Sequence, residues 1–124
     1  MLALWLMTGL LIKHFLFDFP LQTQRMIEEK GIYLKEHGIG HSYLHGFGTA
    51  VVFVLAGIPF GIAGLAGFMD FTIHYHVDYW KSNLCRKFNL TPSDKWFWTA
   101  IGLDQLLHGL TYVALIHLVL NRVS

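Results

Sequence analysis

Acidic residues and histidines recur at helical spacing in the segment Asp70–Lys81, which reads DFTIHYHVDYWK. Asp70, His74 and Asp78 are each four residues apart, so a helix would place the three side chains along one face. The segment follows a long apolar run, and an ionisable group at membrane depth costs roughly 2.5–3.5 kcal/mol on insertion scales. Such groups need a partner or a function, so this stripe of polar side chains predicts a site.

Other segments of the chain carry ionisable pairs at the same four-residue spacing. Together with the first segment they give His14/Asp18, His41/His45, His74/Asp78 and Asp104/His108. Both members of such a pair lie on one face of a helix, which chelation of a metal ion by a helix requires. Imidazole and carboxylate together suit a divalent transition metal, with zinc the leading expectation and manganese or iron the alternatives. The pairs exceed the ligands of one tetrahedral zinc ion, so either one or two ions are expected.

We expect the ligands of the first ion to come from the two middle pairs: His41, His45, His74 and Asp78. The two outer histidines would then complete a second metal site: His14 and His108.

The remaining acids receive other roles in this expected site. A catalytic metal needs an open position for water and a group that takes the proton of that water. We assign this catalytic role, or that of a bridging ligand, to Asp18 or Asp104. Asp70 lies one turn deeper than His74 and is expected to be a supporting or buried hydrogen-bonding group. Lys81 either extends to the membrane interface, which we favour, or balances the charge of the acids.

The composition places the chain among membrane proteins. Of its 124 residues 54% are hydrophobic and 14% are charged, and the mean hydropathy is +0.46; a soluble domain has about a quarter of its residues charged. The formal net charge is +1 and no long basic run occurs, which argues against nucleic-acid binding. The single cysteine, Cys85, cannot form an intrachain disulfide. An N-terminus without an early Lys or Arg favours a retained membrane helix over a cleaved signal peptide.

The apolar segments predict an all-α fold with a single domain over residues 1–124. We expect long helices at about 2–19, 41–57, 60–83 and 92–120, and a short interfacial helix at about 20–30. The sequence GIPFG at 57–61 allows two interpretations: one kinked helix over about 47–70, or a tight turn between two helices. Because Pro59 forces the preceding residue out of helical geometry, we favour the turn.

Loop charge gives the expected orientation. In the hairpin arrangement both polar loops lie on one side of the membrane, and that side collects most of the cations: Arg25, Lys30, Lys35, Lys81, Arg86, Lys87 and Lys95. Only Arg122 lies on the other side. Since cytoplasmic loops carry an excess of Lys and Arg, we expect both loops in the cytoplasm and both termini outside. The sequence thus predicts a polytopic membrane protein, a four-transmembrane-helix bundle, with all four polar pairs in its cytoplasmic half.

Four motifs follow one another along the chain: KHFLFDFPLQT, GHSYLHG, HYHVDYWK and DQLLHG. Together they resemble an uncharacterised family of small bacterial and phage integral-membrane proteins, and the resemblance covers nearly the whole chain. It implies a multi-pass protein of the bacterial inner (cytoplasmic) membrane, and it adds Gln22, Lys81 and Gln105 to the paired residues. It implies no particular chemistry.

Three functions follow as hypotheses. The first is a metal-dependent hydrolase of an amphiphilic substrate, because the expected site lies near the level of the lipid headgroups. The second is a proton or metal-ion conduit, which would need polar groups through the outer half, where only Thr8, Thr111 and His117 are available. The third is a phage-type membrane effector whose polar pairs only set helix packing. In each case the lipid bilayer is the expected partner and nucleic acid is not, and a homo-oligomer stays open.

Overall fold

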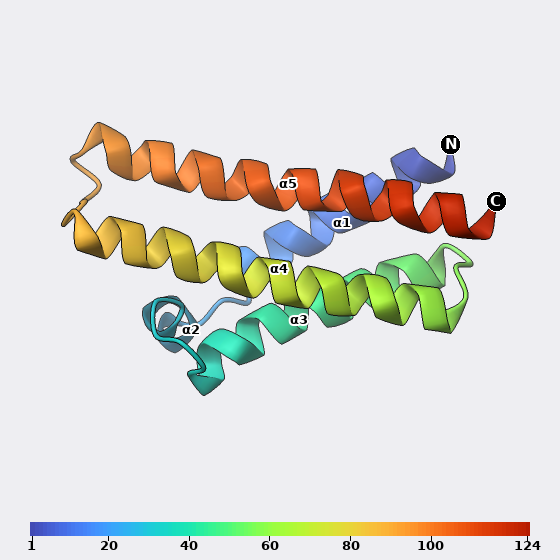
Figure 1. Cartoon of the computed structure of the whole chain (residues 1–124), viewed down its shortest axis with the longest axis horizontal. Helices are drawn as coiled ribbons and strands as arrows, with labels where there is room; N and C mark the ends of the chain where they lie inside the picture. Colours follow the sequence, from blue (N-terminus) through green and yellow to red (C-terminus); the bar gives the residue numbers. More distant parts are fainter.

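The computed structural model describes all 124 residues, and it contains helices joined by short segments without any strand (Figure 1). The helices are α1 (Leu2–Asp18), α2 (Gln24–Glu29), α3 (Glu36–Leu55), α4 (Phe60–Lys87) and α5 (Lys95–Val123). The all-α class predicted from the sequence is therefore confirmed.

The four long helices form a bundle in which each helix packs against two others. α1 packs against α3 and α5, and α4 also packs against α3 and α5, so the four helices enclose a common interior. Both termini lie at one end of the bundle together with the α3–α4 turn, whereas α2 and the α4–α5 turn lie toward the other end (Figure 1). Side chains from four separate segments of the chain can therefore meet between the helices.

α3 and α4 pack closely because two glycines face each other across their interface. A Cβ atom on Gly46 would lie 2.5 Å from the carbonyl oxygen of Gly67, and a Cβ atom on Gly67 would lie 2.5 Å from the carbonyl oxygen of Gly46. Any side chain at either position would force the backbones apart, so glycine is required at both.

A tight turn joins α3 to α4. Gly57 has a φ of +85°, which residues with a Cβ atom rarely adopt, and the N–H of Ile58 donates to the carbonyl oxygen of Phe53 at 3.0 Å. Pro59 then occupies the N-cap of α4. Residues 36–55 and 60–87 thus form two helices with a turn between them and not one kinked helix.

The helix ends differ from the expected ones. α3 begins at Glu36 rather than near residue 41, and α4 continues to Lys87 rather than ending near residue 83, because neither added stretch contains a proline. α5 begins at Lys95 and not at Pro92. Asp94 is the N-cap residue, but its side chain caps no N–H of the helix and instead accepts a hydrogen bond from the N–H of Thr91 at 2.8 Å, in the turn before the helix. α1 ends at residue 18 instead of 19.

The segment between α1 and α3 contains a shorter helix than expected, over residues 24–29 instead of about 20–30. The hydroxyl of Thr23 caps this helix by accepting a hydrogen bond from the N–H of Met26 at 3.2 Å. Glu29 then accepts a hydrogen bond from the backbone N–H of His37 at 2.9 Å, and this bond holds the pKa of Glu29 below its usual value. The contact fixes this segment against the first turn of α3.

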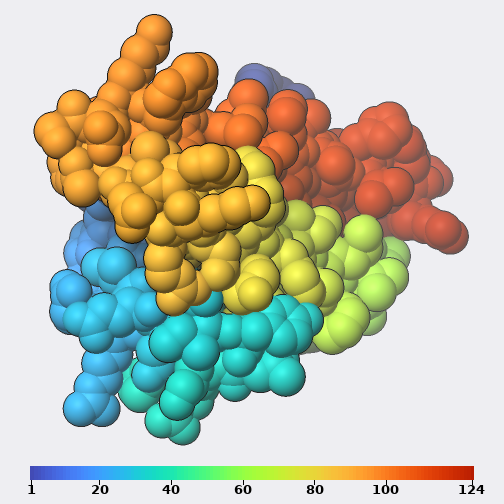
Figure 2. Space-filling view, turned by 60° about the vertical axis from the view of Figure 1, so that its left-hand side comes forward, coloured from blue at the N-terminus to red at the C-terminus, as the bar shows by residue number.

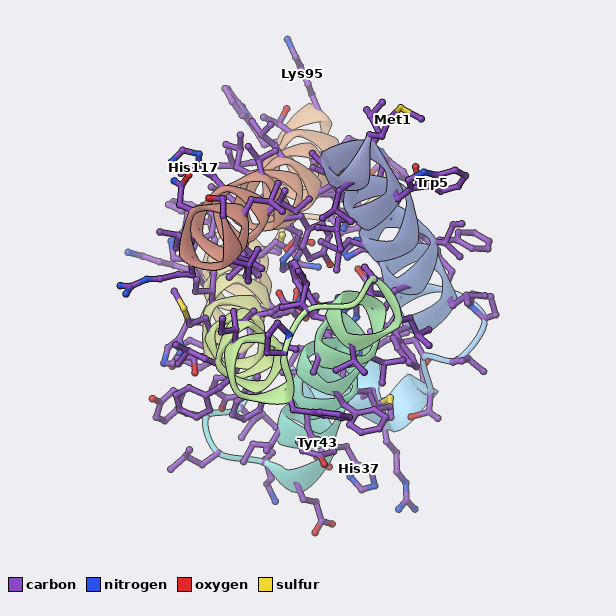
Figure 3. The ribbon with its side chains drawn as sticks, turned by 90° about the vertical axis from the view of Figure 1, so that its right-hand side faces the viewer. Met1, Trp5, His37, Tyr43, Lys95 and His117 are labelled. Atoms are coloured by element: carbon purple, nitrogen blue, oxygen red, sulfur yellow. The ribbon has the colours of Figure 1, made fainter.

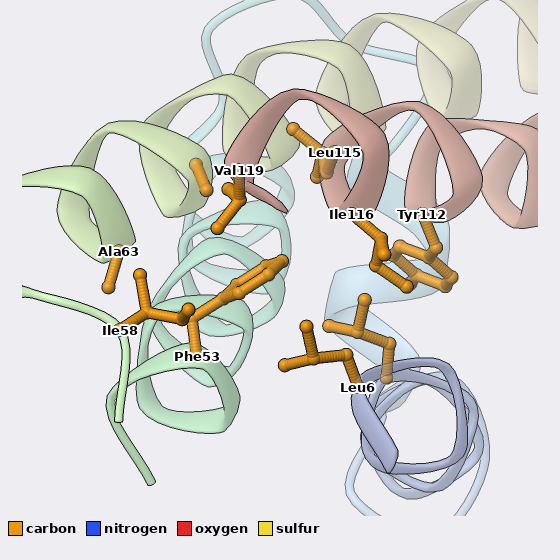
Figure 4. Close-up of a cluster of buried hydrophobic side chains, with 10 residues drawn as sticks. Leu6, Phe53, Ile58, Ala63, Tyr112, Leu115, Ile116 and Val119 are labelled. Carbon is orange, nitrogen blue, oxygen red and sulfur yellow. The ribbon is translucent and has the colours of Figure 1, made fainter. Parts of the chain in front are cut away.

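The interior of the bundle is divided into an apolar half and a polar half. The apolar half lies near the termini, where side chains such as Leu6, Phe53 and Val119 pack together (Figure 4). The polar half contains lysine, aspartate and histidine side chains that are at most 8% exposed: Lys13, His14, Asp18, Lys30, His41, His45, Asp70, His74, Asp78, Asp104 and His108. Charged residues are almost never this buried unless they are paired, so the polar half needs its own explanation.

The outer surface of the bundle is rich in large apolar side chains. They occur on all four long helices, and Trp5 and Tyr43 point away from the interior (Figure 3). By length and composition one helix, Lys95–Val123, could cross a membrane. The predicted bundle of four transmembrane helices therefore stays a prediction.

Candidate metal centre

The residues singled out by their four-residue spacing all lie in one buried cluster. α1 contributes His14 and Asp18, α3 contributes His41 and His45, α4 contributes His74 and Asp78, and α5 contributes Asp104 and His108. Each pair lies on the face of its helix that is turned toward the interior, as the spacing predicts.

Asp18 is surrounded by imidazole nitrogens. Its Oδ1 atom lies 2.9 Å from Nε2 of His45, 3.1 Å from Nε2 of His41 and 3.9 Å from Nε2 of His74. Its Oδ2 atom lies 3.1 Å from Nε2 of His14. Four histidines from three helices therefore converge on this one carboxylate.

Asp78 is the second carboxylate on which histidines converge. Its Oδ2 atom lies 3.2 Å from Nε2 of His74 and 3.4 Å from Nε2 of His41, and these two nitrogens are 3.4 Å from each other. Its Oδ1 atom lies 3.2 Å from Nε2 of His108, which in turn lies 2.9 Å from Oδ1 of Asp104.

Two overlapping groups of these residues could hold a metal ion, and His74 belongs to both: Asp18, His41, His45 and His74; and His74, Asp78 and His108. Several atoms of these groups make no hydrogen bond: Oδ2 of Asp78, and Nδ1 of His41 and of His74; Oδ1 of the neighbouring Asp104 makes none either. Oδ2 of Asp78 faces two imidazole nitrogens and, at 3.4 Å, the ammonium group of Lys30, and it is hydrogen-bonded to none of them, although a buried carboxylate oxygen normally has a hydrogen-bond partner. A cation bound between these groups would satisfy that oxygen.

Three lysines neutralise three of the four buried carboxylates. Nζ of Lys13 lies 3.0 Å from Asp70, Nζ of Lys30 lies 3.4 Å from Asp78, and Nζ of Lys81 lies 3.5 Å from Asp104. Asp18 is the one buried carboxylate without a lysine partner. An uncompensated buried charge is strongly destabilising, so the polar half carries a deficit of positive charge at Asp18 that a metal ion would remove.

Lys13 also determines the direction of the neighbouring hydrogen bonds. An ammonium group only donates, and Nζ of Lys13 lies 3.4 Å from Nδ1 of His45 and 3.1 Å from the hydroxyl of Tyr112. Nδ1 of His45 therefore accepts, and its Nε2–H donates to Asp18. The Tyr112 hydroxyl accepts from Lys13 and donates to Nδ1 of His14 at 2.8 Å, which leaves Nε2 of His14 as a donor.

Sequence reasoning missed Lys13, Lys30, Thr49 and Tyr112 as members of the cluster. Thr49 follows His45 by four residues and Tyr112 follows His108 by four, so the helical spacing could have identified both. The Thr49 hydroxyl donates to Oδ2 of Asp70 at 2.6 Å.

The two remaining lysines differ in how far the sequence could have revealed them. Lys13 could have been identified as a buried member of the cluster, because it is a lysine within an apolar segment. Nothing in the sequence shows that Lys30 turns inward from the loop after α2. For Lys81 the sequence left two possibilities, and the structure shows the less favoured one, in which it balances an acid instead of extending to the interface. Its side chain is 19% exposed and pairs with Asp104. Asp70 is a buried hydrogen-bonding group, as expected.

The two glutamines of the motifs also contact the site. Oε1 of Gln105 accepts from Nε2 of His14 at 2.8 Å, and the amide of Gln22 donates to the backbone carbonyl of Asp18 at 2.7 Å. Both glutamines therefore support the carboxylate on α1 and its neighbouring histidine.

The fold and site define an all-helical bundle with a buried cluster of histidine and aspartate that could bind metal. Residues 6–124 match the family described as "Protein of unknown function (DUF3307)", and the chain belongs to that family. The match agrees with the resemblance of the four motifs to an uncharacterised family. No curated protein and no solved structure matches the chain.

Proposed function

We propose that this protein binds one divalent transition-metal ion, zinc, and that it hydrolyses an amphiphilic substrate. The proposed ligands are Asp18 and His41 from the first candidate group, Asp78 from the second, and His74, which belongs to both. The mutual spacing of four atoms carries the proposal: Oδ1 of Asp18, Oδ2 of Asp78 and the two Nε2 atoms. Five of the six separations among these atoms, all but the one between the two carboxylate oxygens, are 3.1, 3.2, 3.4, 3.4 and 3.9 Å. A tetrahedral zinc ion with bonds of about 2.1 Å requires separations of about 3.4 Å between its ligand atoms.

The other histidines serve as hydrogen-bond donors in this proposal. His45 and His14 each have Nδ1 occupied as an acceptor, so their Nε2–H groups donate and orient Asp18 rather than bind the ion. His108 connects Asp78 to Asp104. This assignment favours one ion over two, because few unprotonated nitrogens are left for a second.

Asp104 is the proposed general base. When water attacks the scissile bond of the substrate, Asp104 would take one proton from the water and would then give that proton to the leaving group as the bond breaks. Oδ1 of Asp104 makes no hydrogen bond, although Nε2 of His108 lies 2.9 Å from it. The same nitrogen lies 3.2 Å from Oδ1 of Asp78. A bound divalent ion supplies the activation of the water by lowering its pKa.

We also propose that α1, α3, α4 and α5 cross a bacterial inner membrane, in line with the resemblance of the motifs. The distribution of side chains supports this, because the polar groups are buried and the large apolar side chains are exposed on every long helix. The helices contain 17, 20, 28 and 29 residues, and about 20 residues span the hydrocarbon core. The inward-facing polar residues lower the hydropathy of α1, α3 and α4.

The proposed orientation places the metal site in the cytoplasmic half. The polar half of the interior lies toward the end of the bundle that holds α2 and the α4–α5 turn. Most of the cations of the chain lie at this end: Arg25, Lys30 and Lys35 between α1 and α3, Arg86 and Lys87 at the end of α4, and Lys95 at the start of α5. At this depth the site would meet the ester and phosphate groups of lipids. A conduit is less well supported, because the other half of the interior is filled by the apolar core.

Metal analysis of the detergent-purified protein tests the proposal. We expect about one zinc ion per chain in the native protein and a loss of at least tenfold in affinity for His74→Ala and for Asp78→Asn, as for removal of a ligand. His117→Ala is the matched control, because His117 lies on α5 but points away from the bundle (Figure 3). Purified protein without any bound transition metal, and unable to take up zinc, would contradict the proposal.

A further inference from the structure

Two apolar grooves lie end to end between α4 and α5. The wider groove has a volume of about 670 Å³ and includes Trp80, Phe88, Trp96 and Leu103 in its lining. The narrower groove has a volume of about 470 Å³ and includes Ile73, Val77, Trp80 and Leu107. Trp80 lines both grooves, so they meet at this side chain, and we call the two together the α4–α5 seam. Figure 2 shows the molecule with the end that contains residues 80–100 toward the viewer.

The α4–α5 seam adjoins the part of the metal cluster that α4 and α5 contribute. Lys81 follows the shared Trp80, and Asp104 and His108 follow groove residues of α5. The ion pair between Lys81 and Asp104 connects α4 to α5 beneath the seam. Lys81 is also the most exposed of the three inward-facing lysines, at 19%, against 5% for Lys13 and 8% for Lys30.

The charges around the seam are positive. Neither groove has an acidic side chain in its lining. The ammonium group of Lys87 lies 5.6 Å from the centre of the Phe88 ring, and Lys95 precedes Trp96 at the end where the wider groove lies. Lys81 lines neither groove, but it follows Trp80, which lines both, and its side chain is 19% exposed. A bound molecule would therefore have an apolar wall along its length and cations toward one end.

We propose that the α4–α5 seam binds an amphiphile with an acyl chain and a phosphate headgroup. The chain lies in the narrower groove along Ile73 and Val77, at the depth of the histidines, and the phosphate lies beside Lys81 at the start of the wider groove. A phosphate offers several anionic oxygens, so it can accept from Lys81 while it faces Lys87 or Lys95. In this position the bond next to the phosphate lies close to Asp104 and to the metal site. The seam as a substrate site rests on the proposed function, although binding itself needs no metal.

Quenching of Trp80 fluorescence tests the binding of such an amphiphile. In a W5F/W96F/W98F variant only Trp80 remains, and dodecyl phosphate with a brominated chain should quench it in a saturable manner. We expect at least tenfold weaker binding of dodecyltrimethylammonium with the same chain. Ile73→Phe, which fills the narrower groove, should weaken the binding of dodecyl phosphate at least fivefold. Leu106→Phe is the control, because Leu106 is exposed on α5 and lies outside both grooves.

Substitution of Lys81 tests the recognition of the headgroup. Lys81→Met should weaken dodecyl phosphate at least tenfold and leave a brominated dodecyl maltoside unchanged, and Lys81→Arg should restore most of the affinity for the phosphate. Equal quenching by the anionic and cationic amphiphiles, or no effect of Ile73→Phe, would overturn the proposal. His74→Ala should still bind dodecyl phosphate. A native protein that takes up no zinc but binds dodecyl phosphate in the seam would contradict the metal site and leave this inference standing.

Discussion

Lys13 provides the most quantitative test of how the polar half of the bundle is held together. Its ammonium group is buried at 6% exposure and contacts three partners: Asp70 at 3.0 Å, the Tyr112 hydroxyl at 3.1 Å and Nδ1 of His45 at 3.4 Å. Lys13→Met keeps an unbranched side chain of similar length and removes only the charge and its donors. The carboxylate of Asp70 then stays buried without a cation.

The magnitude follows from the cost of breaking a buried ion pair by removing one partner, about 3–5 kcal/mol. Lys13→Met should lower the free energy of unfolding by this amount. The double variant Lys13→Met/Asp70→Asn leaves no uncompensated charge, and the amide oxygen introduced by Asp70→Asn can still accept from Thr49, whose hydroxyl donates to the carboxylate in the native protein. We therefore expect the double variant to be more stable than Lys13→Met by about 2 kcal/mol, with only the lost hydrogen bonds as residual cost.

Equilibrium unfolding in mixed detergent micelles, followed by circular dichroism, measures both variants. Lys35→Met is the control, because Lys35 is exposed and should change the free energy of unfolding by less than about 0.5 kcal/mol. A loss below about 1 kcal/mol for Lys13→Met would show that the pair is not buried in the folded protein. A double variant that loses the sum of both single losses would show that Lys13 and Asp70 do not interact.

Two further predictions concern the packing and the pH dependence of the bundle. Gly46→Ala should destabilise the fold by about 1–3 kcal/mol, because the new Cβ meets the carbonyl oxygen of Gly67, whereas Gly64→Ala should be neutral or stabilising, since nothing lies within 4 Å of its Cβ. Both can be measured by the same unfolding titration. Glu29 has a lowered pKa in the folded state, so its ionised form stabilises the fold above the usual pKa of glutamate, about 4.3, and this stabilisation is lost as the pH falls further. Glu29→Gln should therefore lose less stability between pH 7 and pH 4 than the native protein, and a pH response equal to that of Glu28→Gln would contradict this.

The sequence was sufficient to predict which residues meet in the cluster, because the four-residue spacing depends only on helical geometry. His14 and Asp104 are far apart in the chain, and yet each was placed on an inward face by its neighbour one turn away. The α3–α4 turn could be predicted for a similar reason, since glycine and proline restrict the backbone locally.

The cations of the cluster could not be predicted in the same way. Lys30 reaches Asp78 from the loop after α2, and no periodic pattern relates a loop residue to a helix face. From its position in the sequence, Lys81 could turn either toward the interior of the bundle or toward the membrane interface. Only the packing of α4 against α5 shows that it turns toward Asp104. The direction of the hydrogen bonds at His45 depends on Lys13, so the separation of ligands from donors also required the structure.

X-ray absorption spectroscopy of the zinc-loaded protein tests the proposed metal site most directly, because it counts the imidazole ligands of the ion. Coordination by Asp18, His41, His74 and Asp78 predicts two imidazoles and two carboxylate oxygens at about 2.0–2.1 Å. His45→Gln should leave this spectrum unchanged, whereas His41→Gln should remove one imidazole. Three or more imidazoles on one ion, or a spectrum that changes with His45→Gln, would contradict the assignment of the ligands.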